Sequence, residues 1–175
     1  MLLSHCGTRR VAKERWNMKH LQLGELLVRH GVLTEAQRDQ VLEAQRHRGG
    51  PFGVLAEEMF GIAPNAVEKA WAEQYACMTP LIDPRTYAVQ SRALEVINRR
   101  QAWQFRVLPL EISGGNLVAC TTKDNLVRAL RFAGWKLGHQ THFLLAEPLA
   151  LGEAMCEYYP MAGMTAQSVC ESVAA

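Results

Sequence analysis

Apolar residues recur at helical spacing in the first half of the chain, and the same pattern of apolar and polar positions occurs there twice. In the first copy, Gly24 opens a leucine-rich segment and Gln45 closes the segment that follows it. In the second copy, Gly53 and Gln74 take these places, and both are displaced along the chain by the same offset. A repeat of this length with two helical segments is one supersecondary unit, so residues 21–76 are predicted to form two successive helix pairs.

Glycine, proline and capping residues predict where the two helices of each copy meet. Gly31 and Gly61 follow the first helical segments, and glycine readily adopts the left-handed turn that a side chain resists. Gly31 and Gly61 are separated by one position more than the other equivalent residues of the two copies. The second copy has therefore gained one residue before Gly61 and lost one after it. Thr34, with Gln37 three residues later, fits a capping box for the second helix, and Pro64 suits the first turn of its counterpart. A sharp corner is therefore expected within each copy.

Beyond Cys77 the period changes, and short strands alternate with helices. Two runs of strand-forming residues, 107–112 and 117–121, flank the tetrapeptide Ser-Gly-Gly-Asn, which is a hairpin signal. The predicted fold class is therefore α+β, with N-terminal duplicated helix pairs packed beside a small mixed α/β sheet subdomain. The other elements predicted for this half are strands at 80–84 and 141–145, helices at 91–96, 99–105, 126–133 and 148–159, and a turn at 134–138.

These patterns divide the chain into four predicted parts. Residues 1–20 hold five lysine and arginine residues against a single glutamate and are predicted to be a basic N-terminal arm. The tandem helix-pair subdomain follows at 21–76, and the small α/β subdomain at 77–160. Residues 161–175 are small and polar, so they are expected to form a flexible tail.

The repeated segments resemble the N-terminal domain of type II secretion and type IV pilus assembly ATPases, in particular its MshEN form. Each copy in that form reads Arg-Leu-Gly-x-x-Leu, then Gly, then a helix that ends Leu-x-x-Gln, and the pair binds cyclic di-GMP. This sequence departs from the motif at both arginines, which are Gln22 and Pro51, and at the second leucine, which is Phe52. The resemblance implies ligand-binding roles for Gln22, Leu23, Gly24, Leu27, Gly31, Gln45, Pro51, Phe52, Gly53, Gly61 and Gln74.

The second half is similar to the same family. The run WQFRVLPLEISGGNLVACTT and the closing EYYP follow the order seen in these ATPase domains, so the resemblance covers roughly residues 21–160. It departs around residues 122–133, a stretch that is several residues shorter than usual.

The duplicated glycines suit a ligand with two phosphates. Backbone N–H groups at Gly24 and Gly53 can each face one phosphate of a two-fold symmetric ligand. The alternative is that both glycines only allow close helix packing. Each absent arginine removes a charged contact worth roughly 1.5 to 3 kcal/mol, so the loss of both is expected to cost about two to four decades of affinity. Arg29, Arg46 and Arg48 are the nearby candidates to replace them.

Composition and absent motifs exclude several other functions. The net charge of +2 is too small to imply a nucleic-acid partner, and the five cysteines are scattered, as in a reduced protein of the cytoplasm. No phosphate-binding loop, G-x-S-x-G or H-E-x-x-H motif occurs, so no enzyme activity is expected. His139 and His142 are three apart, but no third ligand clusters beside them, so no metal site is predicted. No apolar run reaches the length of a membrane span, and a cytoplasmic location is expected.

The predicted function is a non-catalytic regulatory or docking domain that has a protein partner in a secretion, pilus or envelope-polysaccharide apparatus and no cofactor. The alternative is a sensor module that binds cyclic di-GMP through the two degenerate Leu-Gly repeats. Absence of the motif arginines favours the first function, and the retained glycine and glutamine residues favour the second.

Overall fold

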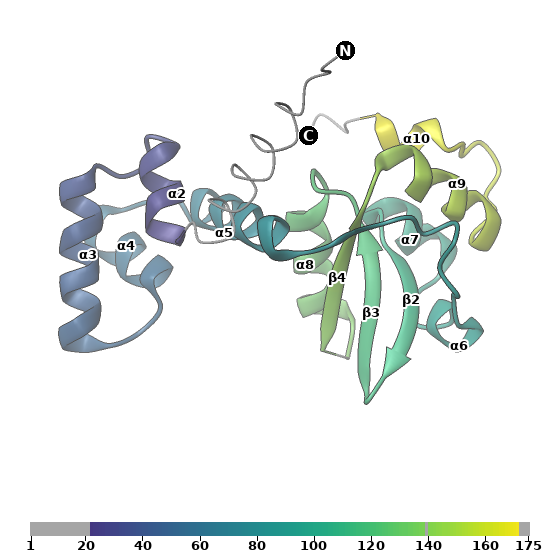
Figure 1. Cartoon of the computed structure of the whole chain (residues 1–175), viewed down its shortest axis with the longest axis horizontal. Helices are drawn as coiled ribbons and strands as arrows, with labels where there is room; N and C mark the ends of the chain where they lie inside the picture. The colour runs from purple at the N-terminus through teal and green to yellow at the C-terminus, as the bar shows by residue number, and fades with distance from the viewer. Residues whose placement is uncertain (1–21, 139, 172–175) are drawn as a thin grey trace, which may run out of the picture. The chain divides into compact units, whose positions relative to one another are not determined.

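A computed structural model describes residues 22–138 and 140–171, and this part of the chain separates into two compact units between Met78 and Thr79 (Figure 1). Unit 1, residues 22–78, is helical. Unit 2, residues 79–171 without residue 139, contains a four-stranded mixed sheet with helices. The fold class is α+β, as predicted. The predicted basic arm lies outside the described residues.

Each copy of the repeat in unit 1 is a pair of helices joined at a glycine. Gly31 and Gly61 have φ angles of 69° and 63°, the left-handed conformation that the sequence predicted for these corners. In the first copy the backbone N–H of Gln37 donates to Thr34 Oγ1 at 3.2 Å, and the backbone N–H of Thr34 donates to Gln37 Oε1 at 2.8 Å. These two bonds complete the predicted capping box. The helices are α2 (Leu23–Arg29), α3 (Glu35–Arg48), α4 (Phe52–Phe60) and α5 (Pro64–Met78).

The two copies pack against each other reciprocally. The first helix of each copy packs on the second helix of the other, so that α2 contacts α5 and α3 contacts α4. Matching positions enter one shared core, because Leu27 and Ala56 are equivalent in the repeat and both fully buried, as are Val41 and Ala70. Fully burying one leucine stabilises a fold by roughly 1.5 to 3 kcal/mol, so burial in this shared core favours the association of the two copies.

The sheet of unit 2 has the strand order β1-β4-β3-β2. An antiparallel hairpin pairs β2 with β3, and β4 runs parallel both to β3 and to β1. Gly114 and Gly115 form the turn of the hairpin with φ angles of 58° and 86°, which is the conformation that a two-residue turn with matching strand twist requires. The strands are β1 (Leu81–Ile82), β2 (Leu108–Ser113), β3 (Asn116–Thr121) and β4 (Thr141–Ala146).

Helices α7 and α8 lie behind the sheet in the view of Figure 1. Phe105 of α7 and Phe132 of α8 stack with their ring centroids 4.0 Å apart. The indole N–H of Trp103 donates to the carbonyl oxygen of Tyr159 at 2.8 Å, so this buried ring has no unpaired polar atom. The helices of unit 2 are α6 (Ser91–Leu94), α7 (Arg99–Phe105), α8 (Leu126–Lys136), α9 (Pro148–Tyr158) and α10 (Gln167–Cys170).

The structure differs from the sequence prediction at the end of α8. The turn predicted at 134–138 begins too early, because α8 runs through Gly134 to Lys136. Glycine inside a helix costs about 1 kcal/mol relative to alanine, which is less than the burial of Phe132 and Ala133 on the same helix contributes.

The residues predicted to form a flexible tail pack on unit 2 as far as they are described. Residues 161–171 include α10, which contacts α9. Val169 is 4% exposed, and the buried Arg106 donates a hydrogen bond to the carbonyl oxygen of Ser168. The backbone of Ala166 occupies the space that a Cβ at Gly152 of α9 would need, so only glycine allows this approach. Composition alone did not reveal this contact, because it depends on a glycine in another element.

Candidate functional site

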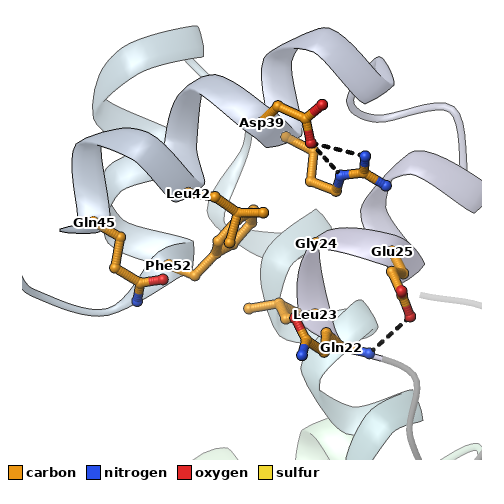
Figure 2. A pocket seen from close by; sticks show the side chains of 9 residues that line it. Gln22, Leu23, Gly24, Glu25, Asp39, Leu42, Gln45 and Phe52 are labelled. Atoms are coloured by element: carbon orange, nitrogen blue, oxygen red, sulfur yellow. Dashed lines mark hydrogen bonds and ion pairs between the residues drawn. The ribbon is translucent and has the colours of Figure 1, made fainter.

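A pocket of about 350 Å³ opens at the start of the first repeat in unit 1. Helices α2 and α3 supply most of its wall, and α4 supplies one ring. Figure 2 shows the apolar side chains of Leu42 and Phe52 between Gln45 and Gly24. The lining residues are Gln22, Leu23, Gly24, Glu25, Arg38, Asp39, Leu42, Gln45 and Phe52.

The structure brings together five of the eleven residues that the sequence resemblance assigned to ligand binding. The other six lie elsewhere in unit 1: Leu27 is buried in the core, Gly31 and Gly61 form the two corners, and the remaining three belong to the second copy. The five that line the pocket are Gln22, Leu23, Gly24, Gln45 and Phe52. The remaining three residues are Pro51, Gly53 and Gln74.

Gly24 is buried beneath two side chains of the protein. A Cβ at this position would lie 2.8 Å from Cζ of Phe52 and 3.0 Å from Cγ of Arg38. Carbon atoms prefer separations of about 3.5 to 4.0 Å, so only glycine permits this packing without movement of its neighbours. The close approach that the sequence predicted at Gly24 is therefore made by protein side chains.

Gly53 repeats this arrangement in the second copy. A Cβ there would lie 2.6 Å from Cγ1 of Val67 and 3.7 Å from Cδ2 of Leu23. Val67 is the repeat equivalent of Arg38, and Phe52 is that of Leu23, so each glycine contacts one side chain of its own copy and one of the other. The repeats are thus related by an approximate two-fold symmetry in their packing, which supports the packing alternative for both glycines.

Arg38 carries the positive charge of the pocket. Its Nε and Nη2 donate to Oδ1 of Asp39 at 2.9 and 2.8 Å, and this hydrogen bonding raises the pKa of Arg38 above its usual range. The side chain of Arg38 is 27% exposed and that of Asp39 is 63% exposed, so the arginine is the more shielded partner. A second carboxylate, on Glu25, accepts a hydrogen bond from the backbone N–H of Gln22 at 3.2 Å. With one arginine and two carboxylates, the formal charge of the lining is negative.

Sequence reasoning missed Arg38. The three arginines that it named do not line the pocket, and one of them, Arg46, pairs with Glu43 at 2.7 Å. The signal was present in the helical period, because positions 38, 42 and 45 are four and then three residues apart and so share one face of α3. Leu42 and Gln45 belong to the Leu-x-x-Gln motif, and Arg38 could have been predicted beside them because it lies on the same face of the helix.

The second copy carries different side chains at the equivalent positions. Glu68 keeps the negative charge of Asp39, but Val67 replaces Arg38. Val54, which is 48% exposed, replaces the charged Glu25, and Trp71, which is 45% exposed, replaces the apolar Leu42. The equivalents of Gln22, Glu25, Arg38, Asp39 and Leu42 are, in this order, Pro51, Val54, Val67, Glu68 and Trp71.

Neither a metal-binding cluster nor a membrane-spanning helix is present in the described part of the chain. No group of three or more His, Cys, Asp or Glu side chains there is placed to hold a metal ion. His142 is exposed on β4, and His139 lies outside the described residues. Among residues 22–138 and 140–171, no helix has both the length and the apolar character that crossing a membrane requires.

Comparison with known proteins places these units in context. A family model described as the MshEN domain matches residues 77–165, so the match covers most of unit 2, and the two repeats lie outside it. The chain is also 21% identical over 148 residues to the type IV pilus assembly ATPase PilB of Myxococcus xanthus (strain DK1622). That alignment covers 85% of this chain and 26% of PilB, so the chain spans about a quarter of the length of this curated relative.

Among solved structures, a structure of MshE with cdg is similar to this chain. The two are 24% identical with a TM-score of 0.45, and the similarity covers 80% of this chain and 100% of the other. The predicted resemblance to the N-terminal domain of pilus and secretion ATPases is confirmed by the family match and the similarity to PilB. Because the family model matches just over half of its residues, the chain belongs to the MshEN domain family.

Proposed function

We propose that this chain is a non-catalytic regulatory or docking domain that has a protein partner in a pilus, secretion or envelope-polysaccharide apparatus. The observation that carries the proposal is membership of the MshEN family together with similarity to a pilus assembly ATPase over 85% of the chain.

Tight binding of a two-phosphate ligand is not expected of the wild-type protein. The pocket has one arginine and two carboxylates, and the equivalent positions of the second copy hold a carboxylate and no arginine. Each missing charged contact to a phosphate is worth roughly 1.5 to 3 kcal/mol, and uncompensated carboxylates oppose an anion further. These losses predict binding that is about two to four decades weaker than with both arginines present.

A calorimetric titration with cyclic di-GMP at moderate salt tests the proposal. The expected result is a titration that shows no saturation at ligand concentrations up to about 100 μM. A dissociation constant above that concentration corresponds to a binding free energy weaker than about −5.5 kcal/mol. A one-to-one complex with a dissociation constant of a few micromolar would contradict a docking function without nucleotide affinity. It would establish the sensor instead.

The second candidate function is that sensor of cyclic di-GMP. One specific observation favours it: Gln22, Leu23, Gly24 and Gln45, which come from both ends of the first motif, line one pocket. A volume of about 350 Å³ lies at the lower end of the range for small-molecule sites, about 300 to 1,000 Å³. Gln45 also donates from Nε2 to the Gly50 carbonyl oxygen at 2.9 Å, which ties this wall to the joint between the copies.

A second experiment addresses catalysis by these 175 residues. The purified chain is expected to release no phosphate from ATP, because the sequence contains no loop that cradles a triphosphate with its lysine and hydroxyl. A malachite-green assay checks this. Hydrolysis that co-elutes with the protein through repeated chromatography would show that an unrecognised nucleotide site exists within these residues.

A further inference from the structure

An apolar strip lies along the second copy, where α4, α5 and the start of α2 meet. Val67 of α5 and Leu23 of α2 both lie against Gly53 of α4. Trp71 follows Val67 by one helical turn, and its ring centroid lies 5.7 Å from that of Tyr75, one turn further along α5. The apolar face, as we name this strip, consists of Leu23, Val54, Val67, Trp71 and Tyr75.

Comparison of the two copies shows that their shared backbone does not require this apolar character. The equivalents of Val54, Val67 and Trp71 in the first copy line one pocket together, so the repeat places these three side chains beside one another as well. Two of those equivalents, Glu25 and Arg38, are charged. Val54 and Trp71 are nevertheless 48% and 45% exposed. Tryptophan is enriched where proteins bind one another, so the face has the composition of a contact surface.

Acidic side chains border the apolar face. Glu57 and Glu58 follow Val54 by three and four residues in α4. Glu68 precedes Trp71 by three residues in α5. Residues three or four apart share one side of a helix, so each of these glutamates lies next to a member of the face. An occupant of the face is therefore expected to combine apolar side chains with positive charge.

The charge of the second copy is opposite to that of the segment that precedes the repeats. Residues 51–78 hold four glutamates and one lysine, a net charge of −3, whereas residues 22–50 hold four acidic and four basic residues. Residues 1–21 hold five lysine and arginine residues and one glutamate, a net charge of +4, together with the apolar Trp16 and Met18. Opposite charges favour association, so the chain itself carries an occupant with the chemistry that the face requires.

The same segment ends at the edge of the apolar face. It lies outside the described residues and joins them at Gln22, next to Leu23, which belongs to the face. Trp16 precedes Leu23 by seven residues, and seven extended residues span up to about 25 Å. Val67 and Tyr75 are eight residues apart in α5, which is about 12 Å along the helix axis. The segment can therefore reach the whole face, where its effective concentration is on the order of 1 mM.

We infer that residues 1–21 bind the apolar face of the second copy, with Trp16 against Trp71 and with basic side chains beside the three glutamates that border the face. The contact forms within one chain, so its extent is independent of protein concentration. It is an interaction that the proposed function does not require, and a protein partner that used the face would have to displace the segment.

A soluble paramagnetic agent tests whether the face is covered, because it broadens the NMR signals of side chains in proportion to their exposure. The signals to follow in the full-length chain are the methyl groups of Val54 and the indole N–H of Trp71. Trp135, which is 78% exposed, and Trp103, which is 2% exposed, supply reference signals from unit 2 in the same sample. In wild type at low salt, the two signals of the face are expected to broaden at least about twofold less than their exposures predict from these references.

Charge reversal in the segment gives the decisive comparison. Arg9→Glu with Arg10→Glu lowers the net charge of residues 1–21 from +4 to zero. The broadening of both signals of the face is then expected to rise by at least about twofold, because attraction to the acidic border is replaced by repulsion. The matched control is Arg99→Glu with Arg100→Glu, an adjacent and exposed arginine pair in unit 2. This control makes the same change in net charge and is expected to leave both signals as in wild type.

A charge swap tests the glutamates at the border of the face. Glu57→Arg with Glu58→Arg in the wild-type background is expected to expose both signals, as reversal of the segment does. Combined with Arg9→Glu and Arg10→Glu, the same pair is expected to restore the shielding, because each side then carries the charge of the other. Trp16→Ser checks the apolar part of the contact and is expected to raise the broadening of the Trp71 signal by at least about twofold.

Three outcomes would overturn the inference. If the broadening of the Val54 and Trp71 signals is the same in wild type and in the folded variant with the reversed segment, residues 1–21 do not cover the face. If the charge swap fails to restore the shielding, the bordering glutamates do not select the segment. If the shielding in wild type disappears on dilution from about 500 to 50 μM, the occupant comes from a second copy of the chain and the contact within one chain is wrong.

Discussion

Replacing Gly53 by alanine tests the reciprocal packing of the repeats directly. A Cβ at this position would lie 2.6 Å from Cγ1 of Val67, about 1 Å inside the preferred separation of two carbon atoms. Val67 is β-branched and belongs to α5, so its χ1 is stiff and it cannot swing away as a long side chain does. Overpacking of this kind costs about 1 to 3 kcal/mol, and the better helix propensity of alanine returns at most about 1 kcal/mol.

The expected net result for Gly53→Ala is a loss of about 1 to 2 kcal/mol in the free energy of unfolding of unit 1. Gly24→Ala should cost less, because the atom that it meets, Cζ of Phe52 at 2.8 Å, is the far end of a half-buried ring. The control is Gly134→Ala in α8. Nothing lies within 4 Å of its added Cβ, so it should stabilise unit 2 by about 0.5 to 1 kcal/mol.

Native-state hydrogen exchange is the suitable assay, because it reports the opening free energy of each helix separately in a chain with two units. Gly53→Ala should lower the protection of amides in α4 and α5. The control Gly134→Ala should raise the protection of amides in α8. The double variant Gly53→Ala with Val67→Ala should cost less than the sum of its single changes, since the second change removes the clash. If Gly53→Ala stabilises unit 1 as much as the control stabilises unit 2, the packing described for Val67 is refuted.

Three further predictions concern the ligand site, a helix cap and the last helices. Gln22→Arg with Pro51→Arg should strengthen cyclic di-GMP binding by about two decades or more in calorimetry, with each change also measured alone because Pro51→Arg frees a backbone N–H; a folded double variant without any gain would mean that the groove is not a nucleotide site. Thr34→Ala should lower the stability of unit 1 by about 1 kcal/mol in urea unfolding, and Thr34→Ser should restore it unless the capping box contributes nothing. Gly152→Ala should lower the stability of unit 2 by more than about 3 kcal/mol in the same assay, because its Cβ would overlap the backbone of Ala166; a neutral result would mean that the last described residues do not pack there.

The sequence by itself determined most of the local structure. Capping by Thr34, the corners at Gly31 and Gly61, and the two-glycine hairpin turn were all predicted, because each depends on backbone preferences within a few residues. It also determined the family, since the MshEN match confirms the resemblance that the motifs indicated. The end of α8 was missed because burial on a neighbouring turn outweighed the weak helix propensity of Gly134.

The tertiary structure alone decided what surrounds the repeated glycines. Gly24 contacts Arg38 and Phe52, which come from two other helices, so no pattern within one segment predicts the contact. The same packing selects Arg38 as the pocket's cation and leaves Val67 in the matching place of the second copy. Periodicity in the sequence shows the face of a helix on which a residue lies, but only the packing of the helices determines which faces contact each other. The charge of a site depends on which side chains these contacts bring together.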